Sequence, residues 1–439
     1  MQLPPSVLDC LQALENHGFA CYAVGGCVRD HLLGLTPHDF DLCTAATPEQ
    51  MKQVFSHHRL VLAGEKHGTV GVVTDSGVVE ITTFRTEGSY RDNRHPDWVE
   101  FVEDIRGDLA RRDFTVNAMA YSPTRGLCDP FGGQKDLENR VLRAVGDADA
   151  RFREDSLRIL RGVRFAVRYG LTPDPATESA MFRLAPLMEN LARERIFDEL
   201  CKLLPLLTAR DLQRFAPVLT AVIPELAPML GFQQHTPHHA YDIYTHTAYV
   251  VENVPGELAL RWAALLHDVG KVSTFSLDEA GCGHFYGHAQ ESAKIADAIL
   301  LRLKAPTQLR QQVVFLIDKH MVLLQPERKT LRRQLSRWGQ DALAQLLILQ
   351  KADNASKGVT EAAPPFAAIE AILAELVAEK ACLTLRELAV NGNDLLALGF
   401  SGKAIGSTLN TLLSQVLEEQ LPNEKQALLT AAKSCITPQ

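Results

Sequence analysis

The sequence lacks paired cysteines, long apolar runs and an excess of basic residues, and each absence removes a class of protein. Its nine cysteines are scattered without a Cys-x-x-Cys pair, which is typical of a reducing compartment and not of a disulfide framework or a zinc knuckle. No uncharged apolar stretch approaches the roughly 18 residues that a membrane span needs. The first residues lack the basic and apolar segments of a secretory signal. We expect a soluble, cytoplasmic protein without a membrane partner; the sequence leaves the oligomeric state open.

The acidic balance of the chain hides two basic segments. A net charge of −8 over 439 residues argues against indiscriminate nucleic-acid binding. Between Arg140 and Arg168, however, stand eight arginines, four acidic residues and no lysine. This bias favours bidentate contacts with phosphates or base edges, with a solvated helix face as the alternative. The second basic cluster comprises Arg328, Lys329, Arg332, Arg333 and Arg337.

The hydrophobic periodicity changes near residue 138. Before it, β-branched runs at 68–74 and 78–84 mix with helical segments, whereas after it apolar residues recur at helical spacing, as in Leu157, Leu160 and Val163. The predicted fold class is an α+β head with a small mixed or antiparallel sheet, followed by an all-α neck, a central helical domain and a helical tail. Proline-containing breaks at 224–237 and 362–365 place the predicted domains at 1–137, 138–225, 238–355 and 362–439.

The most informative segment is Asp39-Phe40-Asp41, downstream of a diglycine turn at Gly25-Gly26. Residues 20–24 predict a strand and Val28 the start of a helix, so the backbone can approach an anion at a helix N-terminus. Alternation along a second strand would place both aspartates on one face, where paired carboxylates suit Mg²⁺. Alone, a diglycine is usually a turn and Asp-x-Asp a solvated strand end. Together they predict a nucleotidyl-transfer site.

Two further segments extend this predicted site. Glu80 is an acid within an apolar strand and a candidate third carboxylate, with an ordinary edge-strand acid as the alternative. Arg112 precedes an acid-capped helix start and, with Arg29, offers guanidinium groups that match the oxygens of a triphosphate. Metal ions bound by the carboxylates would neutralise the charge of that triphosphate.

The segment 154–164 predicts the element that selects the base. Asp155 and Arg158 are three residues apart and therefore neighbours on one predicted helix face. One acceptor beside one donor matches the Watson–Crick edge of cytosine or adenine, whereas guanine and uracil present the reverse order. An ordinary salt bridge between the two side chains is the alternative.

These motifs stand in the order of one known family. Gly-Gly-x-Val-Arg-Asp at 25–30, Asp-x-Asp at 39–41, Arg-Arg-Asp-Phe-Thr-Val-Asn-Ala at 111–118, Asp-Pro-Phe-Gly-Gly at 129–133 and Glu-Asp-x-x-Arg at 154–158 resemble the class II branch of the polymerase-β superfamily. That branch comprises CCA-adding tRNA nucleotidyltransferases and bacterial poly(A) polymerases. The resemblance covers residues 20–200 densely. The tail segments 391–395 and 399–402 are similar, more loosely, to the end of the family that contacts the tRNA elbow.

The resemblance implies an enzyme that adds C, C and A to the 3′ end of tRNA from CTP and ATP. Asp39 and Asp41 would bind catalytic Mg²⁺, and Asp155 with Arg158 would act as the amino-acid template. The implied nucleotide-binding residues are Gly25, Gly26, Arg29, Arg111, Arg112, Asp155, Arg158, Arg161 and Arg164. The segment 85–98 matches in position the flexible loop that such enzymes need for the final A.

A second candidate metal site lies in the central helical domain. Its ligands would be His246, His267, Asp268, His288, His320 and Asp353. A lone histidine on an apolar helix is usually a satisfied core residue, but six imidazole and carboxylate groups suit a divalent transition metal. The pattern resembles the HD phosphohydrolase superfamily and implies hydrolysis of phosphoesters, for example at a damaged tRNA end.

Three functional hypotheses follow from the sequence. The first is CCA addition, with a phosphohydrolase module as a further element. The second is a poly(A) polymerase acting on RNA 3′ ends, because such enzymes share the head motifs. The third is a non-catalytic RNA-binding protein on the same fold, against which the intact pair of Asp39 and Asp41 counts.

Overall fold

The computed structural model describes residues 1–37, 39–87, 99–359, 364–379 and 381–434. The chain forms two compact units, Met1–Ala227 with Arg302–Ala305 and Pro228–Leu301 with Pro306–Gln439. Their boundary falls inside the proline-containing break at 224–237, while the finer division into four domains stays a prediction. Every helix in the described ranges is too short or too polar to cross a lipid bilayer.

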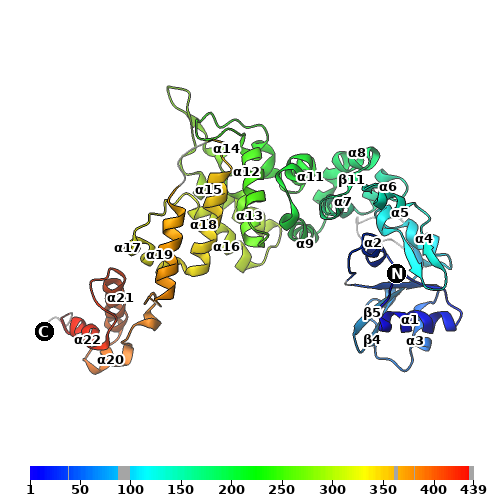
Figure 1. Ribbon diagram of the computed structural model, residues 1–439, viewed down its shortest axis with the longest axis horizontal. Helices are drawn as coiled ribbons and strands as arrows, with labels where there is room; N and C mark the ends of the chain where they lie inside the picture. Colours follow the sequence, from blue (N-terminus) through cyan, green and yellow to red (C-terminus); the bar gives the residue numbers. More distant parts are fainter. Residues whose placement is uncertain (38, 88–98, 360–363, 380, 435–439) are drawn as a thin grey trace. The chain divides into compact units, whose positions relative to one another are not determined.

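The first unit begins with a seven-stranded sheet in the order β3-β4-β5-β2-β1-β8-β9 (Figure 1). In that order the strands are Leu60–Val61, Thr69–Thr74, Gly77–Thr83, Asp41–Thr44, Cys21–Val24, Ala120–Ser122 and Gly126–Cys128. β2 and β5 pair in parallel, and the other neighbours pair antiparallel. The prediction of an α+β head with a small mixed sheet is confirmed.

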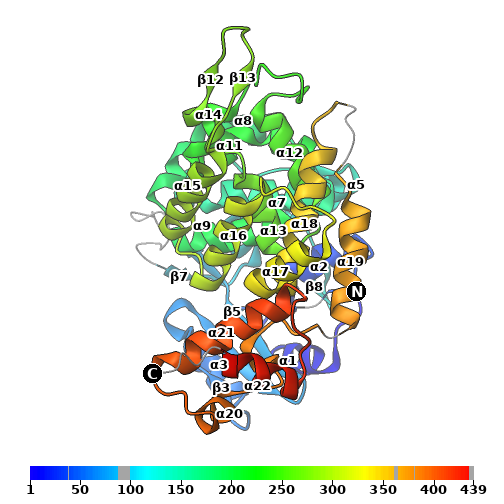
Figure 2. The ribbon, with the colours of Figure 1, turned by 90° about the vertical axis from the view of Figure 1, so that its left-hand side faces the viewer.

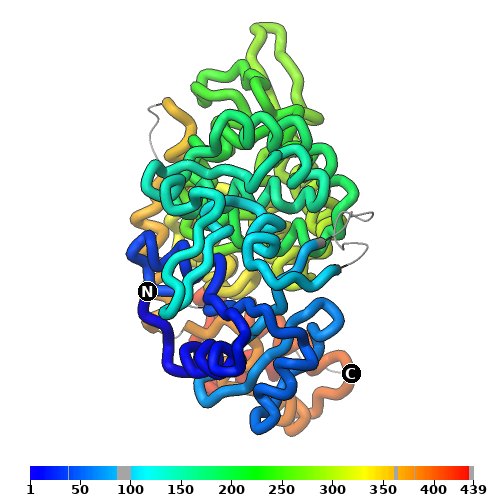
Figure 3. The backbone as a smooth tube through the Cα atoms, turned by 90° about the vertical axis from the view of Figure 1, so that its right-hand side faces the viewer, coloured from blue at the N-terminus to red at the C-terminus, as the bar shows by residue number. Residues whose placement is uncertain are grey.

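Short helices cover this sheet and then continue as the neck (Figure 3). The helices of this unit are α1 (Pro5–Asn16), α2 (Gly26–Leu32), α3 (Pro48–Val54), α4 (Ile105–Ala110), α5 (Gly133–Glu138), α6 (Ala148–Glu154), α7 (Leu157–Tyr169), α8 (Pro175–Leu184), α9 (Arg193–Leu203), α10 (Ala209–Arg214) and α11 (Ala216–Val222). α1 and α3 contact each other and the sheet. Two-residue strands β10 (Val141–Leu142) and β11 (Thr172–Pro173) pair within the otherwise helical neck.

The predicted loop at 85–98 is only partly within the described residues. Arg85–Glu87 form β6, which pairs with β7 at Val99–Phe101. Residues 88–98 lie outside the described ranges, so the loop's role in adding the final A stays a prediction.

Head and neck share one aromatic core. Phe114 is fully buried, with its ring centroid 6.4 Å from that of Phe152 and 5.8 Å from that of Phe165. A Cβ atom at Gly162 on α7 would lie 3.0 Å from the Phe114 ring, so a larger residue would force the ring to shift by a few tenths of an ångström. Glycine at this helical position therefore allows α7 to lie directly against the head.

The neighbouring Asp113 ties the two parts together by charge. Its carboxylate accepts hydrogen bonds from the Asn117 amide at 2.9 Å and from Arg161 on α7 at 2.9 and 2.7 Å. Burial disfavours the ionised form, but Arg161 and Asn117 hold the pKa of Asp113 at about 2. The carboxylate thus stays charged inside the protein because its partners are fixed around it.

The second unit packs α12 (Ile243–Asn253), α13 (Leu258–Leu266), α16 (Thr307–Lys319) and α18 (Gln340–Ala355) around the fully buried Trp262. α14 (Lys271–Thr274), α15 (His288–Arg302), α17 (Arg328–Trp338) and α19 (Phe366–Ala378) complete this helical region. The largely helical prediction is confirmed. A two-stranded hairpin, β12 (Ser276–Leu277) and β13 (Gly283–His284), projects from these helices (Figure 2).

The tail has a small core of its own. Helices α20 (Gly392–Ala397), α21 (Lys403–Leu417) and α22 (Lys425–Ser434) enclose Leu395, Leu412 and Leu428. Asn391 caps α20 by accepting from the amides of Asn393 and Asp394. The predicted tail motif therefore has a structural use, and its contact with tRNA stays a prediction.

The second basic cluster is largely neutralised within the protein. Arg328 pairs with Glu375, Glu379 and Glu419, Arg332 with Glu419 and Arg333 with Glu418. These pairs join α17 to α19 and α21. Much of this charge is therefore used to hold helices together.

Replacing Asp113 tests the joint between head and neck. Asp113→Asn should lower the free energy of unfolding by about 2 kcal/mol near neutral pH, because an ionised group whose pKa falls from 3.8 to about 2 on folding is lost. The stabilisation is complete above the unfolded pKa and disappears as the pH falls through the folded pKa. Urea titrations followed by circular dichroism should show the two curves converging between about pH 4 and 2.

The exposed Asp9 provides the control, and Asp9→Asn should change the free energy of unfolding by less than about 0.5 kcal/mol. An Asp113→Asn variant as stable as the wild type at pH 7 would show that this ion pair does not hold the joint.

Candidate functional site

Three carboxylates line one cavity at the edge of the head sheet. β2 begins at Asp41, and its parallel pairing of Leu42 with Ile81 places Asp41 beside Glu80 on β5. Asp39, Asp41 and Glu80 all line a cavity of about 730 Å³. The prediction that both aspartates alternate along a strand is wrong for Asp39, because the partner strand β1 ends at Val24, opposite Asp41.

The charges of this cavity favour a bound cation. Although the residue is exposed, desolvation by neighbouring atoms raises the pKa of Asp41, Arg112 lowers it, and Glu80 and Asp39 raise it further. Three carboxylates that repel one another are stabilised when a divalent ion lies between them. Among the described residues, the three do not form a group whose ligand atoms all lie within 4.8 Å of one another. An ion bound here would therefore keep several waters, as Mg²⁺ usually does.

The diglycine turn makes room for Arg112. Gly25 has a φ of 72°, which favours glycine, and a Cβ atom there would lie 2.6 Å from Arg112 Nη1. Arg112 also contacts Asp108 at 3.4 Å. α2 begins at Gly26, two residues before the predicted start at Val28, because Gly25 already makes the turn.

The arginines predicted to bind nucleotide have partners within the protein. Arg29 is buried, donates to Asn117 and Asp30, and lies 4.2 Å from the centre of the Tyr169 ring. Arg111 pairs with Asp108 at 2.8 Å. Both roles in nucleotide binding stay predictions.

α7 carries two more of these predicted arginines. Arg161 pairs with Asp113 at 2.7 Å, and Arg164 pairs with the buried Glu199 and lies 4.5 Å from the centre of the Phe165 ring. The two side chains therefore hold α7 against the head and against α9.

The expectation that Asp155 and Arg158 share a helix face is wrong. α6 ends at Glu154 and α7 starts at Leu157, so Asp155 lies in the break between them with an extended backbone. Its carboxylate accepts from the Leu157 amide at 3.1 Å, and acidic caps of this kind interrupt helices.

Both side chains reach other partners across this break. Asp155 pairs with Arg195 at 2.8 Å, and Arg158 donates to Glu154 at 2.8 Å and to the Arg111 carbonyl at 2.9 Å. The salt bridge proposed as the alternative reading is not among the ion pairs of the described residues. The Asp155 carboxylate and the Arg158 guanidinium therefore both lie at the turn between α6 and α7.

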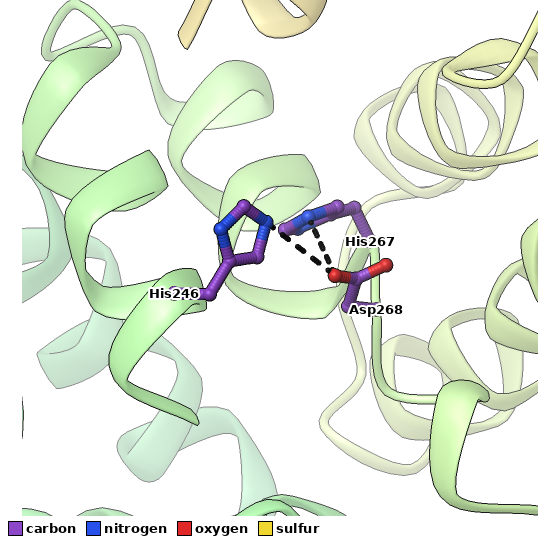
Figure 4. Close-up of side chains that lie close together, drawn as sticks. All are labelled: His246, His267 and Asp268. Carbon is purple, nitrogen blue, oxygen red and sulfur yellow. Dashed lines mark ion pairs between the residues drawn. The ribbon is translucent and has the colours of Figure 1, made fainter. Parts of the chain in front are cut away.

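In the second unit the structure brings all six predicted ligands together. His246 lies on α12, His267 and Asp268 directly follow α13, His288 begins α15, His320 follows α16, and Asp353 lies on α18. His246, His267 and Asp268 have ligand atoms within 4.8 Å of one another, and so do Asp268, His288 and His320. Figure 4 shows the first group, in which both rings face the Asp268 carboxylate. Asp268 is common to both groups.

Each imidazole is oriented by a backbone carbonyl. The Nδ1 atoms of His246, His267, His288 and His320 contact the carbonyls of Ser356, Ala264, Phe285 and Ile317 at 3.1, 2.8, 2.8 and 2.6 Å. Because a carbonyl only accepts, Nδ1 carries a proton in each ring, and Nε2 is the atom directed inward. This arrangement is the usual support of metal-ligating histidines.

The inward atoms of the cluster lie close together. Nε2 of His246 is 3.0 Å from Asp353 and 3.5 Å from Asp268, and Nε2 of His288 is 3.3 Å from Nε2 of His320. Within the described part of the chain, Nε2 of His246 and His267 and both oxygens of Asp268 are buried with no hydrogen-bond partner. Lys271 supplies one positive charge, 2.8 Å from Asp268, and the remaining imidazole and carboxylate groups are a donor set that fits a divalent metal ion.

Electrostatics point the same way. Burial disfavours the charged Asp268, yet His267 and Lys271 hold the pKa of its carboxyl well below the usual range. Burial lowers the pKa of His320 to about 4. A cluster with ionised carboxylates and a neutral imidazole is ready for a divalent ion.

Models of three protein families match separate segments of the chain. Residues 21–143 match the poly A polymerase head domain, and residues 170–211 match a probable RNA and SrmB-binding site of polymerase A. Residues 285–432 match a putative tRNA nucleotidyltransferase domain 2.

Relatives cover nearly the whole chain. The CCA-adding enzyme of Latilactobacillus sakei is 34% identical over 97% of this chain and 97% of its own length. The chain belongs to the CCA-adding enzyme family. The CCA-adding enzyme of Geobacillus kaustophilus is 42% identical over 52% of this chain and 59% of its own length.

Solved structures of the CCA-adding enzyme family agree over the full length. The Bacillus stearothermophilus CCA-adding enzyme in complex with CTP is 29% identical, with a TM-score of 0.73 and 98% of each chain covered. The Thermotoga maritima CCA-adding enzyme in complex with tRNA-CCA has a TM-score of 0.62 at 21% identity, covers 99% of this chain and 97% of its own, and shows the shared fold.

Several residues of this family member were not singled out from the sequence. Asp113 and Asn117 stand inside a motif that was quoted only for its arginines, and Lys271 follows the His-Asp pair and contacts Asp268 at 2.8 Å. His239, whose buried Nδ1 has no hydrogen-bond partner among the described residues, lies 5.1 Å ring to ring from His246. The only available signal was the histidine-rich stretch at 235–239.

Proposed function

We propose that this CCA-adding enzyme adds C, C and A to the 3′ end of tRNA by two-metal chemistry with Mg²⁺ held by Asp39, Asp41 and Glu80. The observation that carries this proposal is the cavity that all three carboxylates share beside Arg112. CTP, ATP and tRNA are the proposed partners, in keeping with relatives solved with CTP, with ATP and with tRNA-CCA.

The chain's own residues account for binding and orientation. Arg112, held against Gly25, offers a positive charge beside the carboxylates for the triphosphate. Magnesium, when bound, would favour ionisation of the RNA 3′-hydroxyl and stabilise the leaving pyrophosphate. The α-phosphorus then exchanges one oxygen partner for another by in-line displacement, so no side-chain nucleophile is needed.

Addition of a poly(A) tract to RNA 3′ ends is the alternative activity, because residues 21–143 match the poly A polymerase head domain. An incorporation assay on tRNA lacking its CCA end separates the two. Products ending after C, C and A with both nucleotides support the proposal, and a long A tract formed without CTP contradicts it.

All cysteines in the described ranges are free thiols, as expected for the proposed cytoplasmic location.

Removing the two aspartates tests the metal role. The double variant Asp39→Ala, Asp41→Ala should lower nucleotide incorporation by roughly 1,000-fold or more, because metal stabilisation is worth several kcal/mol. Binding of tRNA should change little, since phosphate contacts come from elsewhere. Primer extension on denaturing gels and a filter-binding assay measure the two quantities.

A matched control uses two exposed aspartates that line a different cavity of the head, Asp9 and Asp75. Asp9→Ala with Asp75→Ala should keep full incorporation. Substantial incorporation by the Asp39/Asp41 double variant would refute the metal role.

We further propose that Asp155 and Arg158 form the amino-acid template for CTP and ATP. One acceptor and one donor flank the same break between α6 and α7, and their backbones are joined by a 3.0 Å hydrogen bond from the Arg158 amide to the Asp155 carbonyl. Binding of a base would replace Arg195 and Glu154 as their partners. The opposed donors and acceptors of guanine and uracil would leave these groups unpaired and be rejected.

Asp155→Asn tests this template with little change in size. The carboxamide presents a donor where the carboxylate only accepts, so the preference for CTP over UTP should fall by about five- to 100-fold. Single-nucleotide kcat/KM values give the ratio. Asp149→Asn, at a partly exposed aspartate on α6 that pairs with Arg183, should leave the ratio unchanged. An Asp155→Asn variant with lower activity but wild-type selectivity would assign the residue a structural role only.

We also propose that the helical centre is an HD-type phosphohydrolase domain with a divalent transition metal. Four inward imidazole nitrogens and two carboxylates support this assignment. A metal bound there would supply Lewis-acid activation for phosphoester hydrolysis. The proposed substrate is a 2′,3′-cyclic phosphate or a 2′-phosphate at a damaged tRNA end. In the cyclic case, water adds to phosphorus, one P–O bond breaks, and a monoester and a free hydroxyl remain.

Replacing His267 and Asp268 tests this second site. The double variant His267→Ala, Asp268→Ala should lose bound divalent metal and metal-dependent phosphodiesterase activity, while keeping CCA addition. Elemental analysis of purified protein and a cyclic-phosphate assay give the two readouts. His57→Ala, at an exposed histidine of the head, should keep both. Equal loss of CCA addition in the double variant would show that the activities are not separable.

A further inference from the structure

A cavity of about 250 Å³ opens beside the metal-ligand cluster of the second unit. Asp268, His288 and His320 line its inner part, and Gly283–Tyr286, at the end of the β12–β13 hairpin, line its outer part. Figure 2 shows this hairpin standing away from the helices. A group that enters the cavity from outside therefore passes the hairpin before it reaches the cluster.

Tyr286 presents an open aromatic face at this cavity. The residue is 77% exposed, and its ring is nearly parallel to that of His284, with centroids 5.2 Å apart and an angle of 10°. The imidazole lies offset against one side of the Tyr286 ring, with its Nδ1 3.4 Å from the Tyr286 hydroxyl, and the high exposure leaves the opposite side of the ring open. A single exposed aromatic is common on protein surfaces, but two stacked rings beside a metal-ligand cluster form a defined platform.

The hairpin fixes these rings before any ligand binds. His284 Nε2 contacts Asp278 at 2.9 Å, and Asp278 in turn accepts from the amides of Ala280 and Cys282 at 3.0 and 2.8 Å. Gly283 lies so close to the Gln234 carbonyl that a Cβ atom would be 2.1 Å from its oxygen. The base of the hairpin is therefore pressed against the neighbouring loop.

Positive charge lies between the rings and the cluster. Lys271 lines the same cavity, 2.8 Å from Asp268 and 2.9 Å from the Gln234 side chain, and Lys357 lines it as well. A ligand that fits this sequence of groups has a phosphate at its inner end and a planar, apolar ring at its outer end. Nucleotides have both, and every nucleobase has a π-face that stacks on an aromatic side chain.

We propose that Tyr286, supported by His284, is a base-stacking platform that selects nucleotide phosphoesters for the metal-ligand cluster. The inference rests on the proposed phosphohydrolase function and names its substrate class: the terminal nucleotide of an RNA, with a cyclic or 2′-phosphate directed to the cluster and its base on Tyr286. Because stacking reads no hydrogen bonds, the platform should accept all four bases with modest preferences.

The test compares a substrate with a base and one without, using the full-length protein with Mn²⁺, Co²⁺, Ni²⁺ or Zn²⁺. Tyr286→Ala should raise KM for adenosine 2′,3′-cyclic phosphate about five- to 100-fold, the range for one lost base–aromatic stack. KM for methyl ribofuranoside 2,3-cyclic phosphate should not change. Tyr286→Phe should behave as the wild type, and so should Leu277→Ala, at an exposed residue of the same hairpin. CCA addition should be unaffected in all three.

A binding measurement gives a readout that does not need turnover. Adenosine 2′-monophosphate titrated into the metal-free protein by isothermal calorimetry should bind Tyr286→Ala more weakly than wild type, and ribose 5-phosphate should not distinguish them. If neither cyclic phosphate is hydrolysed with any of the four metals, the phosphohydrolase function fails, and this titration alone decides on the platform. The platform is overturned if Tyr286→Ala and wild type have the same ratio of KM values for the two cyclic phosphates and the same affinity for adenosine 2′-monophosphate. Tyr286 would then be an ordinary surface residue.

Discussion

The first unit depends on one buried carboxylate, Asp113. It lies between head and neck, and from it a chain of polar contacts runs through Asn117 to Arg29, and from Arg29 to Asp30 and Tyr169. In the other direction Asp113 holds Arg161 on α7. Each charged group of this network has a partner of opposite charge. Buried ion pairs and hydrogen bonds therefore take the place of part of the apolar core between head and neck.

This network uses the same arginines that the family resemblance assigns to the nucleotide. Without a ligand, Arg29, Arg161 and Arg164 each have a protein partner. A triphosphate would therefore compete with the protein's carboxylates for the guanidinium groups. The free energy gained from each new contact is the difference between a guanidinium–phosphate and a guanidinium–carboxylate hydrogen bond. Arg112 has only a long contact with Asp108, at 3.4 Å, and its Nε is buried without a hydrogen-bond partner in the described residues. We therefore expect Arg112 to be the arginine that an incoming phosphate displaces most easily from its protein partner.

Periodicity and motif order were enough to predict β-branched runs at 68–74 and 78–84, where β4 and β5 lie, and the helical remainder, and to select six residues that the fold of the second unit brings together. Their role as metal ligands stays a prediction. These features are local or depend on residue types that have few other uses when buried. The break at Asp155 was missed because a helix pattern in apolar residues does not reveal a carboxylate that caps the next helix. The neutralised arginines of α17 were missed for another reason: their partners on α19 and α21 lie about 50 to 90 residues away in the sequence. Which distant carboxylate pairs with each arginine is decided by helix packing, so the local sequence gives no indication of it.

The two candidate metal sites are built on opposite principles. In the second unit, backbone carbonyls fix each imidazole and helices bury the ligands, so the site is organised before a metal arrives and resembles a resident centre. In the head, Asp39 lies outside any strand, Glu80 is exposed, and the carboxylates stand apart along an open cavity. If it binds Mg²⁺ as proposed, such a site would hold the ion weakly alone and would gain its remaining oxygen ligands from the substrate phosphates. A resident metal suits hydrolysis by water, whereas a metal that arrives with its nucleotide suits a transferase that must not act before its substrate is in place.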